Sequence, residues 1–348
     1  MTIEELVMQA GTNGASDIHL VEGIPPKYRI NGQLEDMNDT RLTPEMCETF
    51  ARVLAGDEYE QIQSIGELDL ARTIAGERVR INLFRQQGYV SAALRILSDH
   101  IPELHTLGLP PVVGEFPAWP KGIILVTGET GSGKSTTLAA ILNTINHTRN
   151  EHIVTLEDPV EYLYEPDKCV INQREVGKDT ASYSDGLRAI LREDPDIILI
   201  GEMRDLSTIE TALTAAETGH LVFATLHTNS AADAVDRIVD VFPADRQPQI
   251  RMQLSTCLKA VLSQQLLPKK DGSGRVAACE VMVVTAAVRN LIREGKTPQM
   301  ISAIQSSAAE GSIVMDNSLL QLLKAHVISA EVALEAASDK AYVKKHLF

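Results

Sequence analysis

The chain has 348 residues, of which 44% are hydrophobic and 23% charged, and its formal net charge is −15. This length predicts two or three domains, each large enough to bury its own core. The acidic balance argues against sequence-independent binding to nucleic acid, which needs a dominant basic surface. No apolar run approaches the roughly 18 residues of a membrane span, and no signal peptide is visible, so we expect a cytoplasmic protein without a transmembrane segment.

The cysteines are four and isolated from one another: Cys47, Cys169, Cys257 and Cys279. No C-x-x-C pair occurs among them. The sequence therefore predicts neither a zinc knuckle nor a disulfide framework.

The first hundred residues read as a small domain built on an antiparallel sheet. Apolar and polar residues alternate over 78–83 and 90–96, so Arg80 and Arg95 would project from the polar face of such a sheet. The Asn31-Gly32 pair predicts a hairpin turn. Taken alone, each arginine is best interpreted as a solvated surface charge. Residues 101–120 carry five prolines and read as an interdomain linker.

The next stretch contains the motif G-x-x-x-x-G-K-S over 128–135. Four apolar residues precede it and an apolar stripe at helical spacing follows it, so its context is strand, loop and helix. Such a loop turns its backbone N–H groups toward phosphate oxygens, and the helix adds the positive end of its dipole. Lys134 would reach the β- and γ-phosphates, and the Ser135 hydroxyl would bind Mg²⁺. The predicted nucleotide-binding residues are Gly128, Glu129, Thr130, Gly131, Ser132, Gly133, Lys134, Ser135 and Thr136.

Three further apolar runs end in polar residues. The run 153–156 ends in Glu157-Asp158, the run 197–200 in Gly201-Glu202, and the run 221–226 in His227. In open parallel α/β sheets, ligands bind at the carboxyl ends of the strands. We therefore expect these polar residues at the sheet edge that carries the phosphate loop.

Phosphoryl transfer to water needs a metal ion, a group that positions the water, and charge stabilisation. We assign Glu202 to polarising the water and to Mg²⁺, directly or through a second-shell contact. Gly201 stands where a metal-binding Asp is usual, so Glu157 or Asp158 would supply the missing carboxylate. His227 would sense the γ-phosphate or hydrogen-bond Glu202, although a structural role at a strand end fits its position equally well.

The rest of the chain reads as packing elements. The sequence predicts one long helix over 250–266, because Ile250, Val261 and four leucines fall at helical spacing there. A strand over 276–284 and several short helices follow. We therefore expect four parts: an N-terminal domain (1–100), a linker (101–120), an α/β nucleotide-binding core (121–270) and a mostly helical C-terminal region (271–348).

Four segments together resemble the Walker A, Asp box, Walker B and His box of the secretion ATPases of type II secretion and type IV pilus systems. They occur in the family's order and cover 128–136, 156–162, 199–205 and 218–228. Within this family the resemblance extends over nearly the whole chain to the retraction ATPases of twitching motility, and includes 287–294 as a C-terminal retraction motif. Glu129 stands where that family commonly has Pro, and Val288 replaces the usual Ile of the retraction motif.

The resemblance implies an α/β architecture with a PAS-like N-terminal α+β domain, a RecA-like P-loop ATPase core and a helical C-terminal extension. It implies a homohexameric, Mg²⁺-dependent ATPase that hydrolyses ATP to power pilus retraction. Arg80, Arg95 and Arg237 fall on positions at which arginines of the family complete the ATP site. The implied partners are the pilus machinery and its inner-membrane platform protein, at the cytoplasmic face of that membrane.

Three alternatives stay open at this point. A pilus-assembly or type II secretion ATPase of the same family typically carries a tetracysteine zinc module and a longer N-terminal region than this sequence has. A nucleic acid translocase would share the core, but the charge of −15 counts against it. A regulatory subunit that does not hydrolyse ATP fits poorly with Lys134, Ser135 and Glu202 all being in place.

Overall fold

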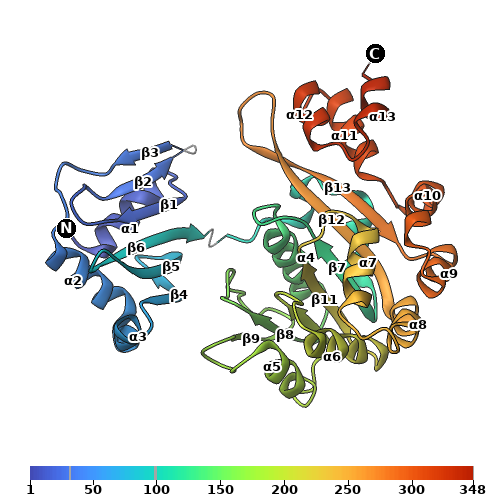
Figure 1. Cartoon of the computed structure of the whole chain (residues 1–348), viewed down its shortest axis with the longest axis horizontal. Coiled ribbons are helices and arrows are strands. Elements are labelled where there is room, and N and C mark those ends of the chain that lie inside the picture. The colour runs from blue at the N-terminus through green and yellow to red at the C-terminus, as the bar shows by residue number, and fades with distance from the viewer. Residues whose placement is uncertain (31–32, 98–99, 348) are drawn as a thin grey trace. The chain divides into compact units, whose positions relative to one another are not determined.

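The computed structural model describes residues 1–30, 33–97 and 100–347. The chain forms two compact units, one of residues 1–101 with 159–163 and the other of residues 102–158 with 164–348 (Figure 1). Within the described part of the chain, no helix combines the length and apolarity needed to cross a bilayer.

The first unit is built on a six-stranded antiparallel sheet in the order β3-β2-β1-β6-β5-β4. Its strands are β1 (Asp17–Leu20), β2 (Lys27–Ile30), β3 (Gln33–Asp36), β4 (Glu67–Ile74), β5 (Glu77–Gln86) and β6 (Tyr89–Leu97), and its helices are α1 (Ile3–Thr12), α2 (Pro44–Ala55) and α3 (Tyr59–Ser64). The predicted antiparallel sheet is thereby confirmed. The turn predicted at Asn31-Gly32 lies outside the described residues.

The two faces of this sheet differ as the sequence alternation requires. Val79, Ile81 and Leu83 are fully buried in a core that they share with α1 and α2. The residues between them, Arg80 among them, lie on the opposite face, because successive side chains of a strand point to opposite sides. The predicted polar face of β5 is therefore present.

The second unit is built on a seven-stranded sheet in the order β13-β12-β7-β11-β10-β8-β9. The strands are β7 (Gly122–Thr127), β8 (His152–Glu157), β9 (Val170–Glu175), β10 (Ile197–Ile200), β11 (Leu221–Leu226), β12 (Leu258–Pro268) and β13 (Arg275–Val283). The six neighbouring strands β12, β7, β11, β10, β8 and β9 run parallel to one another. The seventh strand, β13, pairs with β12 in the antiparallel sense. All residues of β7, β10 and β11 are buried, as expected of central parallel strands.

Helices cover both faces of this sheet. On one face, α4 (Lys134–Thr148) packs with the 3-10 segments η2 (Leu104–Leu107) and η3 (Pro111–Ala118). The other face packs against α5 (Tyr183–Ile190), α6 (Leu206–Glu217), α7 (Ala231–Asp240), α8 (Gln247–Cys257) and α9 (Ala286–Glu294). The proline-rich stretch from 102 onward is thus a packed part of the second unit, in which Val113 and Phe116 are fully buried.

The last three helices, α11 (Met315–Lys324), α12 (Ala330–Ala336) and α13 (Lys340–Lys345), gather at the turn of the β12–β13 hairpin (Figure 1). The segments before them are η4 (Thr297–Gln299), α10 (Met300–Ser306) and η5 (Ala308–Glu310), of which α10 packs beside α9. Hairpin residues Leu267 and Ala278 pack against α11 to α13. The strand predicted over 276–284 is confirmed as β13, which pairs along almost the whole of β12.

The single long helix predicted between 250 and 266 is wrong. α8 ends at Cys257, and Leu258–Pro268 forms β12 beside the P-loop strand β7. A strand buried on both faces is a continuous apolar run, so some of its leucines fall at helical spacing by coincidence. The strand β9 was not predicted, because it is a polar edge strand with only Glu175 buried.

Candidate active site

The phosphate loop has a backbone that only glycine accommodates at three positions. Gly128, Gly131 and Gly133 have φ angles of 141°, 80° and 93°, which side chains rarely adopt. A Cβ atom at Gly128 would lie 2.4 Å from the backbone oxygen of Gln264. The next helix, α4, begins at Lys134 behind an N-cap glycine that has no side-chain oxygen to accept from its first N–H groups. These N–H groups form the type of helix N-terminus that binds phosphate.

Lys134 is folded over this loop. Its Nζ atom donates hydrogen bonds to the backbone oxygens of Gly128, at 2.7 Å, and Glu129, at 2.9 Å. A cavity of about 340 Å³ adjoins the loop, with a lining that includes Thr130, Ser132 and Gln264. A phosphate group would offer the ammonium a stronger, charged partner than these carbonyls do.

The other predicted residues lie at the expected sheet edge. Glu157 ends β8, while Glu202 and His227 follow β10 and β11 directly, and these three strands neighbour one another beside β7. The Nε2 atom of His227 lies 3.3 Å from Oε1 of Glu202. The structure therefore brings these two side chains into direct contact, as one of the two interpretations of His227 required.

Glu202 is a largely buried carboxylate that stays ionised. Its side chain is 18% exposed, and its Oε1 atom lies 2.6 Å from Nε of Arg204. Burial raises the pKa of Glu202, but the hydrogen bond from Arg204 and the charge of His227 outweigh burial and hold that pKa below its usual range. The carboxylate is thus available as a hydrogen-bond acceptor at neutral pH.

The geometry explains why glycine precedes Glu202. A Cβ atom at Gly201 would lie 3.0 Å from the hydroxyl of Tyr183 and 3.1 Å from the backbone oxygen of Leu156. An aspartate does not fit between these neighbours without displacing them. Burial raises the pKa of Tyr183, and the carboxylates of Asp158, Glu202 and Glu157 raise it further, so this phenol stays protonated.

Glu157 is held from inside the sheet. Its Oε1 atom accepts hydrogen bonds from Oγ1 of Thr155, at 2.6 Å, and from Nε2 of Gln173, at 3.4 Å. Its side chain is only partly buried. A carboxylate at this position has remaining acceptor capacity, because each ionised carboxylate offers about four lone-pair sites.

The three predicted arginines lie on different elements. Arg237 is exposed on α7 of the second unit. In the strand register of the first unit, Arg80 lies opposite Arg95, Arg95 opposite Asp17, and Asp17 opposite Arg29. These four residues form one row across β5, β6, β1 and β2. Arg95 donates to Asp17 at 2.9 Å. The sequence did not predict that Arg29 belongs to this row, because its place there depends on the pairing of β2 with β1.

This row carries an excess of positive charge. It contains three arginines and one aspartate, and like charges opposite one another on neighbouring strands are destabilising. Such a row is suited to receive an anion.

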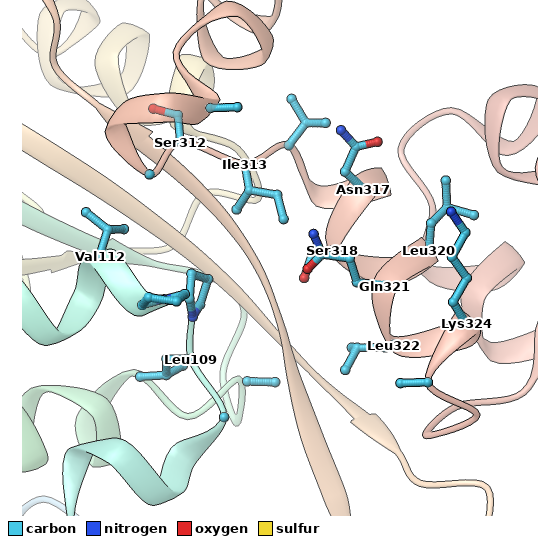
Figure 2. A pocket seen from close by; sticks show the side chains of 18 of the residues that line it. Leu109, Val112, Ser312, Ile313, Asn317, Ser318, Leu320, Gln321, Leu322 and Lys324 are labelled. Carbon is cyan, nitrogen blue, oxygen red and sulfur yellow. The ribbon is translucent and has the colours of Figure 1, made fainter.

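A second cavity, of about 770 Å³, lies elsewhere in the second unit. Figure 2 shows Leu109 and Val112 on one side of it and Ile313, Asn317 and Gln321 on the other. None of the described residues that line it is an Asp or a Glu. Its lining is far less suited to metal-assisted phosphate chemistry than the sheet edge at the P-loop.

The donor set is typical of a site where Mg²⁺ depends on its nucleotide. Among the residues that the structure describes, no three His, Cys, Asp or Glu side chains cluster as they would to hold a metal ion by themselves. All four cysteines are buried free thiols. Mg²⁺ commonly binds through substrate phosphates and one or two protein oxygens, and Ser135 and Glu202 are oxygen donors of that kind.

Comparison with known proteins identifies the family of the chain. Residues 1–334 match the family model described as "Type II/IV secretion system protein", and the chain belongs to this family. It is 47% identical, over 97% of its own length and 98% of the other's, to the "Type IV pilus retractation ATPase PilT" of Pseudomonas aeruginosa. It is 44% identical to a "Twitching motility protein" of Neisseria gonorrhoeae, over 90% of this chain and 84% of that protein.

A solved structure, "Crystal Structure of the Pilus Retraction Motor PilT and Bound ADP", superposes on this chain with a TM-score of 0.92. The two chains share 48% identity, and the match covers 99% of each. The mixed α/β fold of the chain is therefore that of a secretion ATPase.

The tight packing at Gly201 leads to a stability prediction. Gly201→Ala should lower the free energy of unfolding by about 1–3 kcal/mol, because the new methyl group forces Tyr183 and the ends of two strands apart. Gly114→Ala is the matched control, since a Cβ atom there has nothing within 4 Å. Urea titration of both variants measures the effect, and equal stabilities would contradict the steric account.

Proposed function

We propose that this protein is an ATP-hydrolysing motor that powers retraction of type IV pili. The observation that carries the proposal is the convergence of the phosphate loop, Glu202 and His227 on one edge of a parallel sheet. The relatives described above support the choice of ATP and of retraction.

ATP binding is assigned to residues 128–136. The loop amides and the N-terminus of α4 receive the phosphates, and Lys134 moves from the loop carbonyls to the β- and γ-phosphates. The Ser135 hydroxyl, on the first turn of α4, and Glu202, directly or through water, would hold Mg²⁺. When bound, this ion neutralises charge on the transferred phosphoryl group.

Hydrolysis is assigned to Glu202. Its ionised carboxylate accepts a hydrogen bond from the attacking water and orients the water's oxygen toward the γ-phosphorus. His227 contacts Oε1 of this carboxylate, which Arg204 also contacts, and holds the direction of the carboxylate. Glu157 ends β8, the strand next to β10, and would be the second carboxylate near Mg²⁺ or the attacking water.

The arginines Arg80, Arg95 and Arg237 are assigned to completing ATP sites within a homohexameric ring. The excess positive charge of the Arg80–Arg95 row supports this assignment, because such a row is stabilised when it meets a polyphosphate. In the same ring, the first unit would act as a PAS-like domain and the second as a RecA-like core. The expected partner is the inner-membrane platform protein of the pilus, contacted from the cytoplasmic face.

The alternative function is that of a pilus-assembly or type II secretion ATPase. The four cysteines do not support the zinc module typical of those enzymes, because each is a buried free thiol in a different part of the chain. The retraction motif over 287–294 supports the proposed retraction function. On α9, Val288 and Ile292 are buried, whereas Arg289 and Arg293 are exposed one helical turn apart.

The two chemical roles predict two different losses. Lys134→Ala should weaken ATP binding, because Lys134 contacts phosphate in the ground state. Glu202→Gln should bind ATP normally and hydrolyse it at least about a hundredfold more slowly, because Glu202 acts on the water. Fluorescent-nucleotide titration and phosphate release measure the two effects on the purified protein. Near wild-type turnover by Glu202→Gln would move the catalytic role to Glu157.

The direction of the motor is tested on α9. Arg289→Ala with Arg293→Ala should leave ATP hydrolysis within about twofold of wild type, because neither side chain is buried in the core. Cells that carry this double variant in place of the wild-type gene should be hyperpiliated and fail to twitch. Val288→Ala is the contrasting variant, since it opens a cavity in the core and should lower the stability of the protein instead. Loss of ATPase activity in step with motility would make the two arginines part of the catalytic fold.

A further inference from the structure

One buried carboxylate of the second unit has no role in the site described so far. Glu280 lies on β13 and is only 7% exposed. In the strand register it pairs with Ser263 of β12, and Ser263 pairs with Thr127, the last residue before the phosphate loop. Thr127 Oγ1 donates a hydrogen bond of 2.8 Å to Oγ of Ser263. Residues paired in this way point to the same face of a sheet, so a buried polar row leads from the phosphate loop to Glu280.

Glu280 contacts the first residues of two helices. Its Oε1 atom accepts a hydrogen bond of 2.8 Å from the backbone N–H of Ala231, the first residue of α7. Its carboxylate also accepts from the backbone N–H of Met315, the first residue of α11. Burial raises the pKa of Glu280 above its usual range, and the charges of Asp233 and Asp316 add to this, while the two N–H groups offset only part of the rise.

Capping the N-terminus of α7 does not by itself require Glu280. The N-cap of α7, Ser230, already accepts a hydrogen bond from the N–H of Asp233. Burying a carboxyl group is costly in either protonation state, so Glu280 at this place needs a reason beyond a second cap. Glu280 differs from Ser230 in fixing the start of α7 to the sheet row that ends at the phosphate loop.

The start of α7 carries the His227 loop. Three residues separate His227 from Ala231, and one of them, Asn229, donates from Nδ2 to Oε1 of Glu129 in the phosphate loop at 3.4 Å. We expect a displacement of the α7 N-terminus to reach the His227 side chain through these three residues. A shift of about 1 Å in a catalytic group can cost up to roughly a hundredfold in rate.

We propose that Glu280 is a positioning residue for ATP hydrolysis, which holds the N-terminus of α7 so that His227 meets Glu202. This inference rests on the proposed role of His227. It makes the contact of β13 with α7 part of the active site, although Glu280 itself touches no nucleotide. It also joins α11, and with it the C-terminal helices, to the same carboxylate.

The test combines one substitution with a double-mutant cycle. Glu280→Gln keeps the shape of the side chain and one acceptor oxygen, but its NH₂ group cannot accept, so one of the two helix N–H groups faces a donor instead of an acceptor. It should lower kcat about tenfold and change ADP affinity less than about twofold, because the phosphate loop is untouched. Combined with His227→Ala, it should cause no further loss, since the positioned side chain is already gone.

A second variant removes the donor instead of the acceptor. Ala231→Pro deletes the N–H that Glu280 binds, at the helix position where proline is best tolerated. Ser230 precedes it with φ −138° and ψ 161°, an extended conformation that proline accepts in its neighbour. It should reproduce the kcat loss of Glu280→Gln and the same non-additivity with His227→Ala. This keeps the test decisive if Glu280→Gln fails to fold.

Asp316→Asn is the matched control. Asp316 is also buried on α11, where it accepts from the N–H groups of Ser338, at 2.8 Å, and Asp339, at 3.0 Å, and so holds the C-terminal helices without touching α7. It should leave kcat within about twofold, because it changes the charge near Glu280 but removes none of the contacts between Glu280 and α7. Multiplicative effects of Glu280→Gln and His227→Ala, or an equal loss in Asp316→Asn, would overturn the positioning role. A normal kcat for His227→Ala would instead overturn the assigned role of His227, and the role of Glu280 with it.

Discussion

The site depends on one constraint, which is that parallel strands end at a common edge. In the order β12-β7-β11-β10-β8, the phosphate loop leaves β7, His227 leaves β11, Glu202 leaves β10 and Glu157 ends β8. Residues that are up to a hundred positions apart in the chain thereby become neighbours. The sheet itself is held by strands that are buried on both faces, so the edge is carried by the most rigid part of the second unit.

Close packing at this edge limits the chemistry that each position can perform. The absence of a side chain at Gly128 lets the loop approach Gln264, and its absence at Gly201 leaves room for Tyr183. An acid at position 201 does not fit, and the carboxylates at this end of the sheet stand at Glu157 and Glu202 instead. Glu202 retains its charge because Arg204 and His227 counteract its burial.

The outer edge of the sheet connects the site to the C-terminal helices. The N–H of Cys279 donates to Oγ of Ser318, and the N–H of Val283 donates to Oγ of Ser312. Val281 forms an isolated antiparallel bridge with Ile313. The free edge of β13 is therefore covered by the segment that leads into α11, which protects it from pairing with another chain.

The sequence predicted the elements whose signals are local. The phosphate loop and the polar ends of β8, β10 and β11 follow from motif and periodicity, and the structure contains all of them. Asn31-Gly32 was a local signal too, but it lies outside the described residues.

What the sequence missed depends on pairing between distant segments. β12 resembled a helix because a strand buried on both faces shows no alternation, and only its place beside β7 reveals it. Arg29 joins the arginine row through a strand register, and Glu280 meets α7 across 49 residues of sequence. Periodicity within a window carries no information of this kind.

The most direct measurement of the central claim is made in cells from which the gene has been deleted. Pilus number and twitching are scored after complementation with the wild-type gene and with Glu202→Gln. The account predicts that deleted cells are hyperpiliated and do not twitch, that wild type restores motility, and that Glu202→Gln does not. Deleted cells without pili would contradict retraction and indicate an assembly motor. Full rescue by Glu202→Gln would contradict the assignment of hydrolysis to this site.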